Sequence, residues 1–178
     1  MTVDTLTPAR AASPVDDPAA ALRARFGPAI LAEQATAEAS PVLWVAPEKS
    51  PEIHRFLKDE IDRPYALLTD LWGIDETARE HRAGQPPSSV TVASHLVSPD
   101  RNADIRLKVA CDADRPQLPT LAGIYPATDW YEREDFDMLG VRFDGHNSHR
   151  RILMPNDWQC HPLRKTIKRA PPKNRPAA

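Results

Sequence analysis

The chain has 178 residues, 41% of them hydrophobic, and a formal net charge of −2 at pH 7, which suits one soluble globular domain with its own core. Its two cysteines cannot build the disulfide framework of a small secreted protein, and no apolar run approaches the ~20 residues of a transmembrane helix. Because the first residues also lack the apolar centre of a signal peptide, we expect a protein of the cytoplasm that meets a membrane only through other proteins.

Charge and proline are unevenly distributed along the chain. Residues 1–149 carry 15 basic and 24 acidic side chains, whereas residues 150–178 carry eight basic side chains and one acidic one. The 19 prolines gather near the two ends. This distribution predicts a disordered tail over 1–17, a globular domain over 18–145 and an extended basic arm over 146–178. Such an arm is typical of a segment that lies on an acidic protein, a nucleic acid or an anionic membrane face, or of a solvated disordered tail.

The first half of the chain predicts two helices and two strands. Residues 18–26 form a helix with proline in its first turn, where the missing N–H costs nothing. Residues 42–45 form a short strand, and residues 65–72 are apolar enough for a buried one. Residues 48–61 form an amphipathic helix, because apolar side chains recur at helical spacing after a typical start signal. The start signal and the apolar face of that helix are Ser50-Pro51, Ile53, Phe56, Leu57 and Ile61.

A hairpin is the clearest strand signal in the chain. Residues 89–98 and 103–112 alternate between apolar and polar on either side of the turn at 99–102. On the second strand Cys111 shares a face with three aliphatic residues, so we expect it to be a small core residue rather than a nucleophile. With a further helix after the hairpin, the element order predicts an α+β fold, in which a mostly antiparallel sheet carries helices on one face.

That further helix, over residues 129–140, carries an unusual density of acidic residues. Asp129 and Glu132 fit the N-cap and the third helical position of a capping box, and Gly140 suits a left-handed C-terminal stop. Acidic residues in the last turn are disfavoured by the helix dipole. We therefore expect a cation from elsewhere in the chain to meet them there. The acids of the last turn and the candidate cations are Asp135, Asp137, Arg142, Arg150 and Arg151, and Asp137 can also pair with Arg133.

The same helix and the segment after it resemble a known family. The spaced set is Glu132-Arg133-Glu134, Asp137-Met138-Leu139-Gly140, His146, Arg150 to Pro155, Asp157-Trp158 and His161 to Lys165. This set is similar to the signature of the 30 kDa-type (C) subunit of proton-pumping NADH:quinone oxidoreductase, the respiratory complex I, including its plant-type and hydrogenase-linked forms. The chain departs from the family pattern at Asn147, His149, Cys160 and residues 166–168.

The resemblance implies a structural subunit of the peripheral arm that is part of an oxidoreductase and has no catalytic activity alone. It implies no cofactor of its own, and docking on the quinone-site (D-like) subunit and on neighbouring iron–sulfur subunits. It implies the cytoplasmic side of the bacterial inner membrane, or the same role in a divergent hydrogenase- or ferredoxin-linked relative. The interface residues that it implies are Glu132, Arg133, Glu134, Asp137, Gly140, His146, Arg150, Arg151, Pro155, Asp157, Trp158, Pro162, Leu163, Arg164 and Lys165.

Residues of the same segment could also be interpreted as a metal, catalytic or cofactor site. A metal site would use His146, His149, Cys160 and His161, but their spacing does not match the common zinc patterns. An acid/base pair would need two carboxylates across a cleft, whereas those of the acidic helix fan around one helix or form a solvated face. No Cys-x-x-Cys pair and no glycine-rich phosphate loop occurs. We therefore expect no catalytic, metal or cofactor residues.

A nucleic-acid-binding protein is the alternative from another class. The basic residues of 150–178 would give a salt-dependent affinity for phosphate. Only Trp158 in that segment offers a stacking surface, whereas single-strand binders interleave several aromatic residues. The acidic body of the chain would also repel a polyanion. The sequence therefore favours a protein partner and predicts no direct contact with nucleic acid.

Overall fold

A computed structural model of the protein describes residues 17–37, 40–81, 84–111 and 115–165. Most of the tail that is expected over 1–17, and the last part of the basic arm, lie outside the described residues. The helices are α1 (Pro18–Phe26), η2 (Gly27–Ala29), η3 (Pro47–Lys49), α2 (Ser50–Arg55), η4 (Phe56–Glu60), η5 (Pro99–Arg101) and α3 (Thr128–Leu139). The strands are β1 (Ile30–Glu33), β2 (Val42–Val45), β3 (Leu67–Asp75), β4 (Val90–Ser98), β5 (Ala103–Cys111), β6 (Gln117–Pro119) and β7 (Arg142–Asp144).

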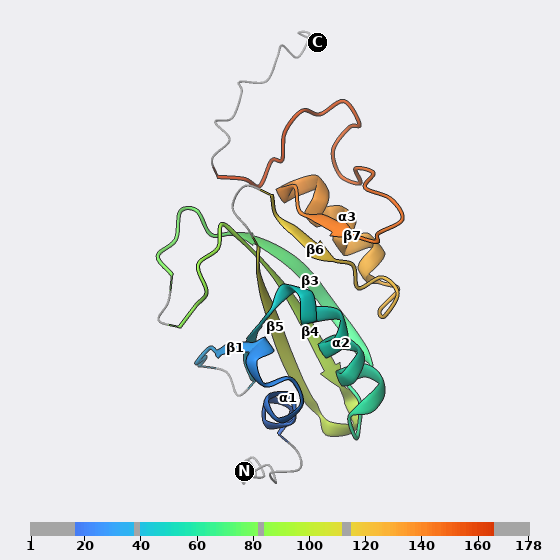
Figure 1. Ribbon diagram of the computed structural model, residues 1–178. Coiled ribbons are helices and arrows are strands. Elements are labelled where there is room, and N and C mark those ends of the chain that lie inside the picture. The colour runs from blue at the N-terminus through green and yellow to red at the C-terminus, as the bar shows by residue number, and fades with distance from the viewer. Residues whose placement is uncertain (1–16, 38–39, 82–83, 112–114, 166–178) are drawn as a thin grey trace, which may run out of the picture.

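A five-stranded sheet with the order β1-β2-β5-β4-β3 forms the body of the molecule (Figure 1). The pair β2–β5 is parallel and the other three pairs are antiparallel. The register of β4 on β5 runs from Val90 opposite Cys111 to Ser98 opposite Ala103, which confirms the predicted hairpin. Its turn closes through Asn102 in the left-handed conformation, at φ 49°, which asparagine tolerates better than most residues.

The core lies between one face of this sheet and the helices. Leu107 of β5, Leu22 of α1 and Leu139 of α3 belong to one cluster of buried apolar residues. The α+β fold with helices on one face is therefore confirmed. Cys111 is 3% exposed in the same cluster, as expected, and burial raises the pKa of its thiol to about 12. A thiol of this kind packs as a small hydrophobic group and is no nucleophile.

Four features of the fold differ from the predictions. The helix expected over 48–61 is three short pieces, and Ser50 is its first α-helical residue rather than its cap. The strand expected over 65–72 as a buried one is β3, which among the described strands pairs with β4 alone and so lies at the sheet edge, and its first residues are exposed. Strand β1 was not predicted. The two-stranded parallel sheet of β6 and β7 was not predicted either.

Helix α3 lies along the edge strand β3. The Asp135 carboxylate accepts a hydrogen bond from the Gly73 N–H at 2.8 Å, and the Tyr131 hydroxyl donates to the Thr69 carbonyl at 3.3 Å. A Cβ atom at Gly73 would overlap the Leu139 side chain, so glycine is what lets the helix approach. Side chains of α3 thus take up polar groups that an edge strand would otherwise present to another chain.

Candidate functional site

The described part of the basic arm, residues 146–165, forms a strap around the C-terminal end of α3 (Figure 1, orange to red). The strap contains turns but no helix or strand. Loops of this length without secondary structure are uncommon in compact domains and usually functional or disordered. The contacts that order this one come from the residues of the family signature.

The carboxylate of Asp137 holds the beginning of the strap. Its Oδ2 accepts hydrogen bonds from three consecutive backbone N–H groups at 2.8–3.0 Å, and its Oδ1 lies 2.5 Å from the Arg151 guanidinium. Burial would raise the pKa of Asp137, but these donors outweigh it and hold the pKa below its usual range. The expectation that a cation meets the acids of the last turn is confirmed for Asp137, through Arg151, but not for Asp135, which accepts from the Gly73 N–H instead. The three N–H groups belong to Ile152, Leu153 and Met154, and we call Asp137 with these donors and Arg151 the clasp.

The end of the strap caps the last turn of α3. A helix leaves its last four carbonyl groups without partners. Here the Asp137 carbonyl accepts from the ring of His161 at 3.0 Å. The next two carbonyls, of Met138 and Leu139, accept from the Leu163 backbone at 3.0 Å and from the Arg164 side chain at 2.6 Å. The strap therefore supplies donors that the end of the helix lacks.

Gly140 ends α3 in the left-handed conformation, at φ 77°, as predicted. A Cβ atom at this position would also lie 2.7 Å from the His161 ring. Glycine is thus required here both by backbone conformation and by the close passage of the strap.

Lys165 ties the end of the strap to the end of strand β3. Its backbone N–H donates to the Asp75 carboxylate at 2.9 Å, and its ammonium group donates to the Asp75 carbonyl at 2.8 Å. Burial would raise the pKa of Asp75, but hydrogen bonds from Thr77 and Lys165 outweigh it and the pKa is lowered. The strap is therefore anchored at both ends, on α3 and on the sheet.

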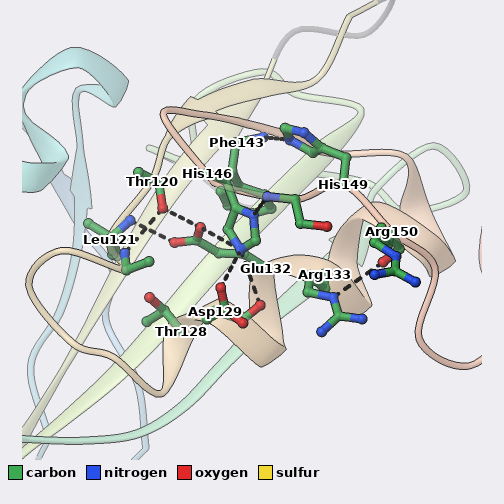
Figure 2. A network of polar contacts seen from close by, with 12 residues as sticks. Thr120, Leu121, Thr128, Asp129, Glu132, Arg133, Phe143, His146, His149 and Arg150 are labelled. Carbon is green, nitrogen blue, oxygen red and sulfur yellow. Dashed lines mark hydrogen bonds and ion pairs between the residues drawn. The ribbon is translucent and has the colours of Figure 1, made fainter.

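A buried network joins α3 to the start of the strap (Figure 2). Glu132 is 1% exposed, and its carboxylate accepts from the Leu121 N–H at 2.6 Å and the Thr120 hydroxyl at 2.5 Å. His146 Nε2 lies 3.3 Å from an Asp129 carboxylate oxygen and 3.9 Å from Glu132. His146 Nδ1 accepts from the Ser148 N–H, so the hydrogen of a neutral ring sits on Nε2 and faces the acids.

This network shows that the predicted capping box is wrong. The N-cap position of α3 is Ala127, and no side chain in the described part of the chain caps the helix there. Glu132 turns away from the helix start because Thr120 and Leu121 offer it two donors in the interior. Burial raises the pKa of Glu132, and the hydrogen bonds of these two donors oppose that rise.

Three acidic residues of α3 are also not solvated, whereas Glu134 is exposed. Glu132, Asp135 and Asp137 are 1%, 5% and 0% exposed. The pairing of Arg133 with Asp137 does not form. The Arg133 guanidinium instead lies 5.0 Å from the centre of the Trp130 ring, and its Nε donates to the Arg150 carbonyl at 3.3 Å.

The expected interface residues divide into two groups in the structure. The inner group holds the strap onto the body of the same chain, whereas the outer group is exposed to solvent. Leu153 and Trp130, each 60% exposed, were not among the residues expected at an interface. Their outward direction depends on how the strap and α3 lie, which no local pattern reveals. The inner group is Glu132, Asp137, Gly140, His146, Arg151, Arg164 and Lys165, with Arg133 beside it, and the outer group is Glu134, Arg150, Pro155, Asp157, Trp158, Pro162 and Leu163.

The histidines that were weighed as metal ligands serve the polypeptide itself. His149 Nε2 accepts from the Phe143 N–H at 3.1 Å, and His161 donates to a helix carbonyl. Within 17–37, 40–81, 84–111 and 115–165, no three His, Cys, Asp or Glu side chains are placed to hold a metal ion. In the same part of the chain no helix combines the length and hydrophobicity needed to cross a membrane.

Comparison with known proteins points to one family. The family model for "Respiratory-chain NADH dehydrogenase, 30 Kd subunit" matches residues 43–173. The chain is 63% identical over 144 residues to the C/D subunit of the NADH-quinone oxidoreductase of Rhodopseudomonas palustris (strain BisB18). It is 54% identical over 152 residues to the protein of the same name from Cereibacter sphaeroides (strain ATCC 17025 / ATH 2.4.3). These matches cover 81% and 85% of this chain but 25% of each relative, so the chain spans about a quarter of their length.

Two solved structures share the fold. A trypsin-resistant fragment of Nqo5 superposes with a TM-score of 0.56 at 20% identity, over 66% of this chain and 88% of the fragment. A chain of the membrane-bound sulfane sulfur reductase, an archaeal respiratory membrane complex, superposes with a TM-score of 0.65 at 21% identity, over 82% of this chain and 81% of that one. At these identities the likeness supports the fold alone.

Proposed function

The chain belongs to the respiratory-chain NADH dehydrogenase 30 Kd subunit family, and on this basis we propose that it is the 30 kDa-type component of an NADH:quinone oxidoreductase. In this role it sits in the peripheral arm on the cytoplasmic side of the bacterial inner membrane. It is not catalytic by itself. It positions the subunits through which electrons pass from NADH to quinone, or does so in a hydrogenase- or ferredoxin-linked relative.

The strap, with its clasp, is the observation that carries this proposal. The inner group of the signature residues binds backbone groups and side chains of the same chain, and so shapes a surface that carries the outer group. Both carboxylate oxygens of Asp137, for example, accept hydrogen bonds from the strap, and both oxygens of Glu132 accept hydrogen bonds from the segment before α3. A site for chemistry would instead direct such groups toward a substrate. A subunit whose distinctive residues build an exposed loop on a rigid body is suited to docking.

The composition of the relatives supports a D-like partner. In the Rhodopseudomonas and Cereibacter proteins the region that matches this chain is part of one longer polypeptide, named as a C/D subunit. Two regions of one polypeptide are held at high local concentration, which favours contact between them. We therefore place the quinone-site, D-like subunit against this chain, with the iron–sulfur subunits as further neighbours.

Three of the four Lys and Arg side chains described in the strap favour a protein partner over nucleic acid, and the fourth, Arg150, is exposed. Arg151 is paired with Asp137, Arg164 donates to a helix carbonyl, and Lys165 donates to Asp75. These three side chains are committed to their own chain, whereas phosphate binding relies on cations that reach outward.

A pull-down from native membranes tests the proposal. The full chain, tagged at its N-terminus, is recovered in mild detergent, and the proteins that accompany it are identified by mass spectrometry. We expect the quinone-site, iron–sulfur and membrane subunits, with NADH:quinone oxidoreductase activity in the recovered complex and none in the isolated chain. Recovery of the chain alone, or with RNA that resists moderate salt, would reject the proposal.

A further inference from the structure

Large exposed apolar side chains are concentrated on the strap. Leu153, Trp158 and Leu163 are 60%, 44% and 56% exposed. We propose that these three residues, the strap anchors, insert into apolar sockets of the D-like subunit and provide most of the docking energy. The inference rests on the proposed function and goes beyond it, because it assigns the contact to three side chains outside the buried part of the clasp.

The backbone of the strap anchors is fixed before any partner arrives. The Leu153 N–H donates to Asp137, and the Leu163 N–H donates to the Met138 carbonyl at the end of α3. The Trp158 N–H closes a turn onto the Pro155 carbonyl at 3.0 Å. With their backbone held in this way, the three side chains remain exposed in the free chain. A preordered loop loses less conformational entropy on binding, so more of its contact energy appears as affinity.

The exposure of these side chains is energetically unfavourable in the free chain. Interface energy is commonly concentrated in a few anchors of this kind, and tryptophan is strongly enriched among them. Single exposed leucines on a sheet are ordinary by comparison. Leu31 of β1 and Leu67 of β3, 48% and 50% exposed, are of that ordinary kind and serve as matched controls.

The relatives indicate that the D-like subunit is the partner that binds the strap anchors. There the region that matches this chain is joined permanently to the rest of a C/D polypeptide. The family model also includes the strap, since it matches residues 43–173. An apolar, preordered surface beside a permanently joined neighbour fits that neighbour better than a transient partner, which would meet a more polar surface.

Site-specific photo-crosslinking in the assembled complex identifies the occupant. A benzophenone amino acid replaces Trp158 or Leu153 in the tagged full-length chain, and Leu31 or Leu67 in the controls. After irradiation of native membranes we expect crosslinks from the two strap positions to the D-like subunit and none to it from the controls. Strap crosslinks to another subunit only, or none at all from a chain that co-purifies with the complex, would overturn the inference.

Alanine variants measure how much the strap anchors contribute to the docking energy. The double variant Leu153→Ala with Trp158→Ala should keep the melting temperature of the free chain and lower the amount of chain recovered in the complex at least about ten-fold, as expected for the loss of two anchors. The double variant Leu31→Ala with Leu67→Ala should be recovered like the wild type. Equal recovery of both variants would overturn the inference while leaving the proposed function intact. If the wild-type chain itself fails to co-purify with oxidoreductase subunits, it is the proposed function that fails.

Discussion

The carboxylate of Asp137 and the guanidinium of Arg151 meet at 2.5 Å across fourteen residues of chain, and this pair joins the last turn of α3 to the strap. The Asp137 side chain is 0% exposed and that of Arg151 13%. Removing one partner of a buried ion pair leaves the other uncompensated, which costs more than the pair contributes. The order of the strap, and with it the outward direction of its apolar residues, therefore depends on this contact.

Replacing Asp137 by Asn tests the clasp directly. The amide keeps the shape but loses the charge and offers one acceptor oxygen in place of two. We expect a loss of about 3 kcal/mol in the free energy of unfolding, the cost typical of breaking a buried pair. The amide hydrogens of 152–154 should also exchange faster. Asp157→Asn, at an exposed position of the strap, should change stability by less than about 0.5 kcal/mol. Unchanged exchange at 152–154 would contradict the role given to Asp137.

Low pH should release the strap as the Asp137→Asn variant does, because protonation removes the charge of Asp137. The pKa of Asp137 is lowered in the folded chain. Its stabilising contribution is therefore complete above the unfolded value of 3.8 and is lost as pH falls through the folded pKa. We expect faster exchange at residues 152–154 below about pH 4, the ordinary pKa of an aspartate, while the hairpin β4–β5 stays protected. Simultaneous loss of protection in both would show that the strap does not open separately from the sheet.

Asp135 should make the chain less stable in alkaline solution. Burial raises the pKa of this carboxyl from 3.8 to about 8, and its Oδ2 lacks a hydrogen-bond partner among the described residues. The folded state then binds more protons than the unfolded state between these values, so stability falls as pH rises. Buried His54, whose pKa is lowered to about 4, has the opposite effect below its unfolded value of 6.5. The effect of Asp135 on stability is therefore separated from that of His54 at about pH 7 to 8.

The variant Asp135→Asn tests whether Asp135 causes this fall in stability with rising pH. An amide cannot ionise, and its oxygen can still accept the Gly73 N–H. Chemical unfolding should show that the wild type loses stability across the same pH window and that the variant loses less. Parallel curves would mean that Asp135 titrates near its ordinary pKa in the folded chain.

Gly140→Ala should destabilise the chain by more than an ordinary surface change. A left-handed residue with a Cβ costs roughly 1–2 kcal/mol, and the new methyl group would also press on His161. Gly123 offers the matched control, because a Cβ there meets nothing within 4 Å. Thermal unfolding of Gly140→Ala and Gly123→Ala should separate clearly. Similar melting temperatures would show that the strap moves aside without cost.

Local patterns predicted the parts of the fold that depend on neighbours in sequence. The alternation over 103–111 is visible without any tertiary information, and so is the stop at Gly140. Strand β3 was taken for a buried one because its composition is apolar. It lies at the edge of the sheet, and α3, which comes much later in the chain, contacts it there through Asp135 and Gly73, at a sequence separation of 62.

The candidate site was predicted in its residues but not in their roles. The resemblance selected Glu132, Asp137 and Arg151, and the structure uses them inside the chain. Their partners lie 11 to 17 residues away, as with Leu121 for Glu132 and Met154 for Asp137. Helical spacing cannot show such contacts, so Glu132 was assigned to a capping box and Asp137 to a pairing with Arg133. Contact with other subunits stays a prediction for all of these residues.

Reversing the charge of Arg151 tests how the clasp and the docking surface are connected. In Arg151→Glu the new carboxylate faces Asp137 in a buried place, and like charges there should force the strap away from α3. The sheet makes no described contact through this side chain, so the body should stay folded. We expect normal far-ultraviolet circular dichroism together with loss of the chain from the assembled oxidoreductase. Arg150→Glu, one residue earlier and exposed, keeps the backbone carbonyl that Arg133 uses and should assemble far better. Arg151→Lys, which keeps the charge, should restore part of the assembly. If Arg151→Glu assembles and supports NADH:quinone oxidoreductase activity as the wild type does, the ordered strap is not what docks.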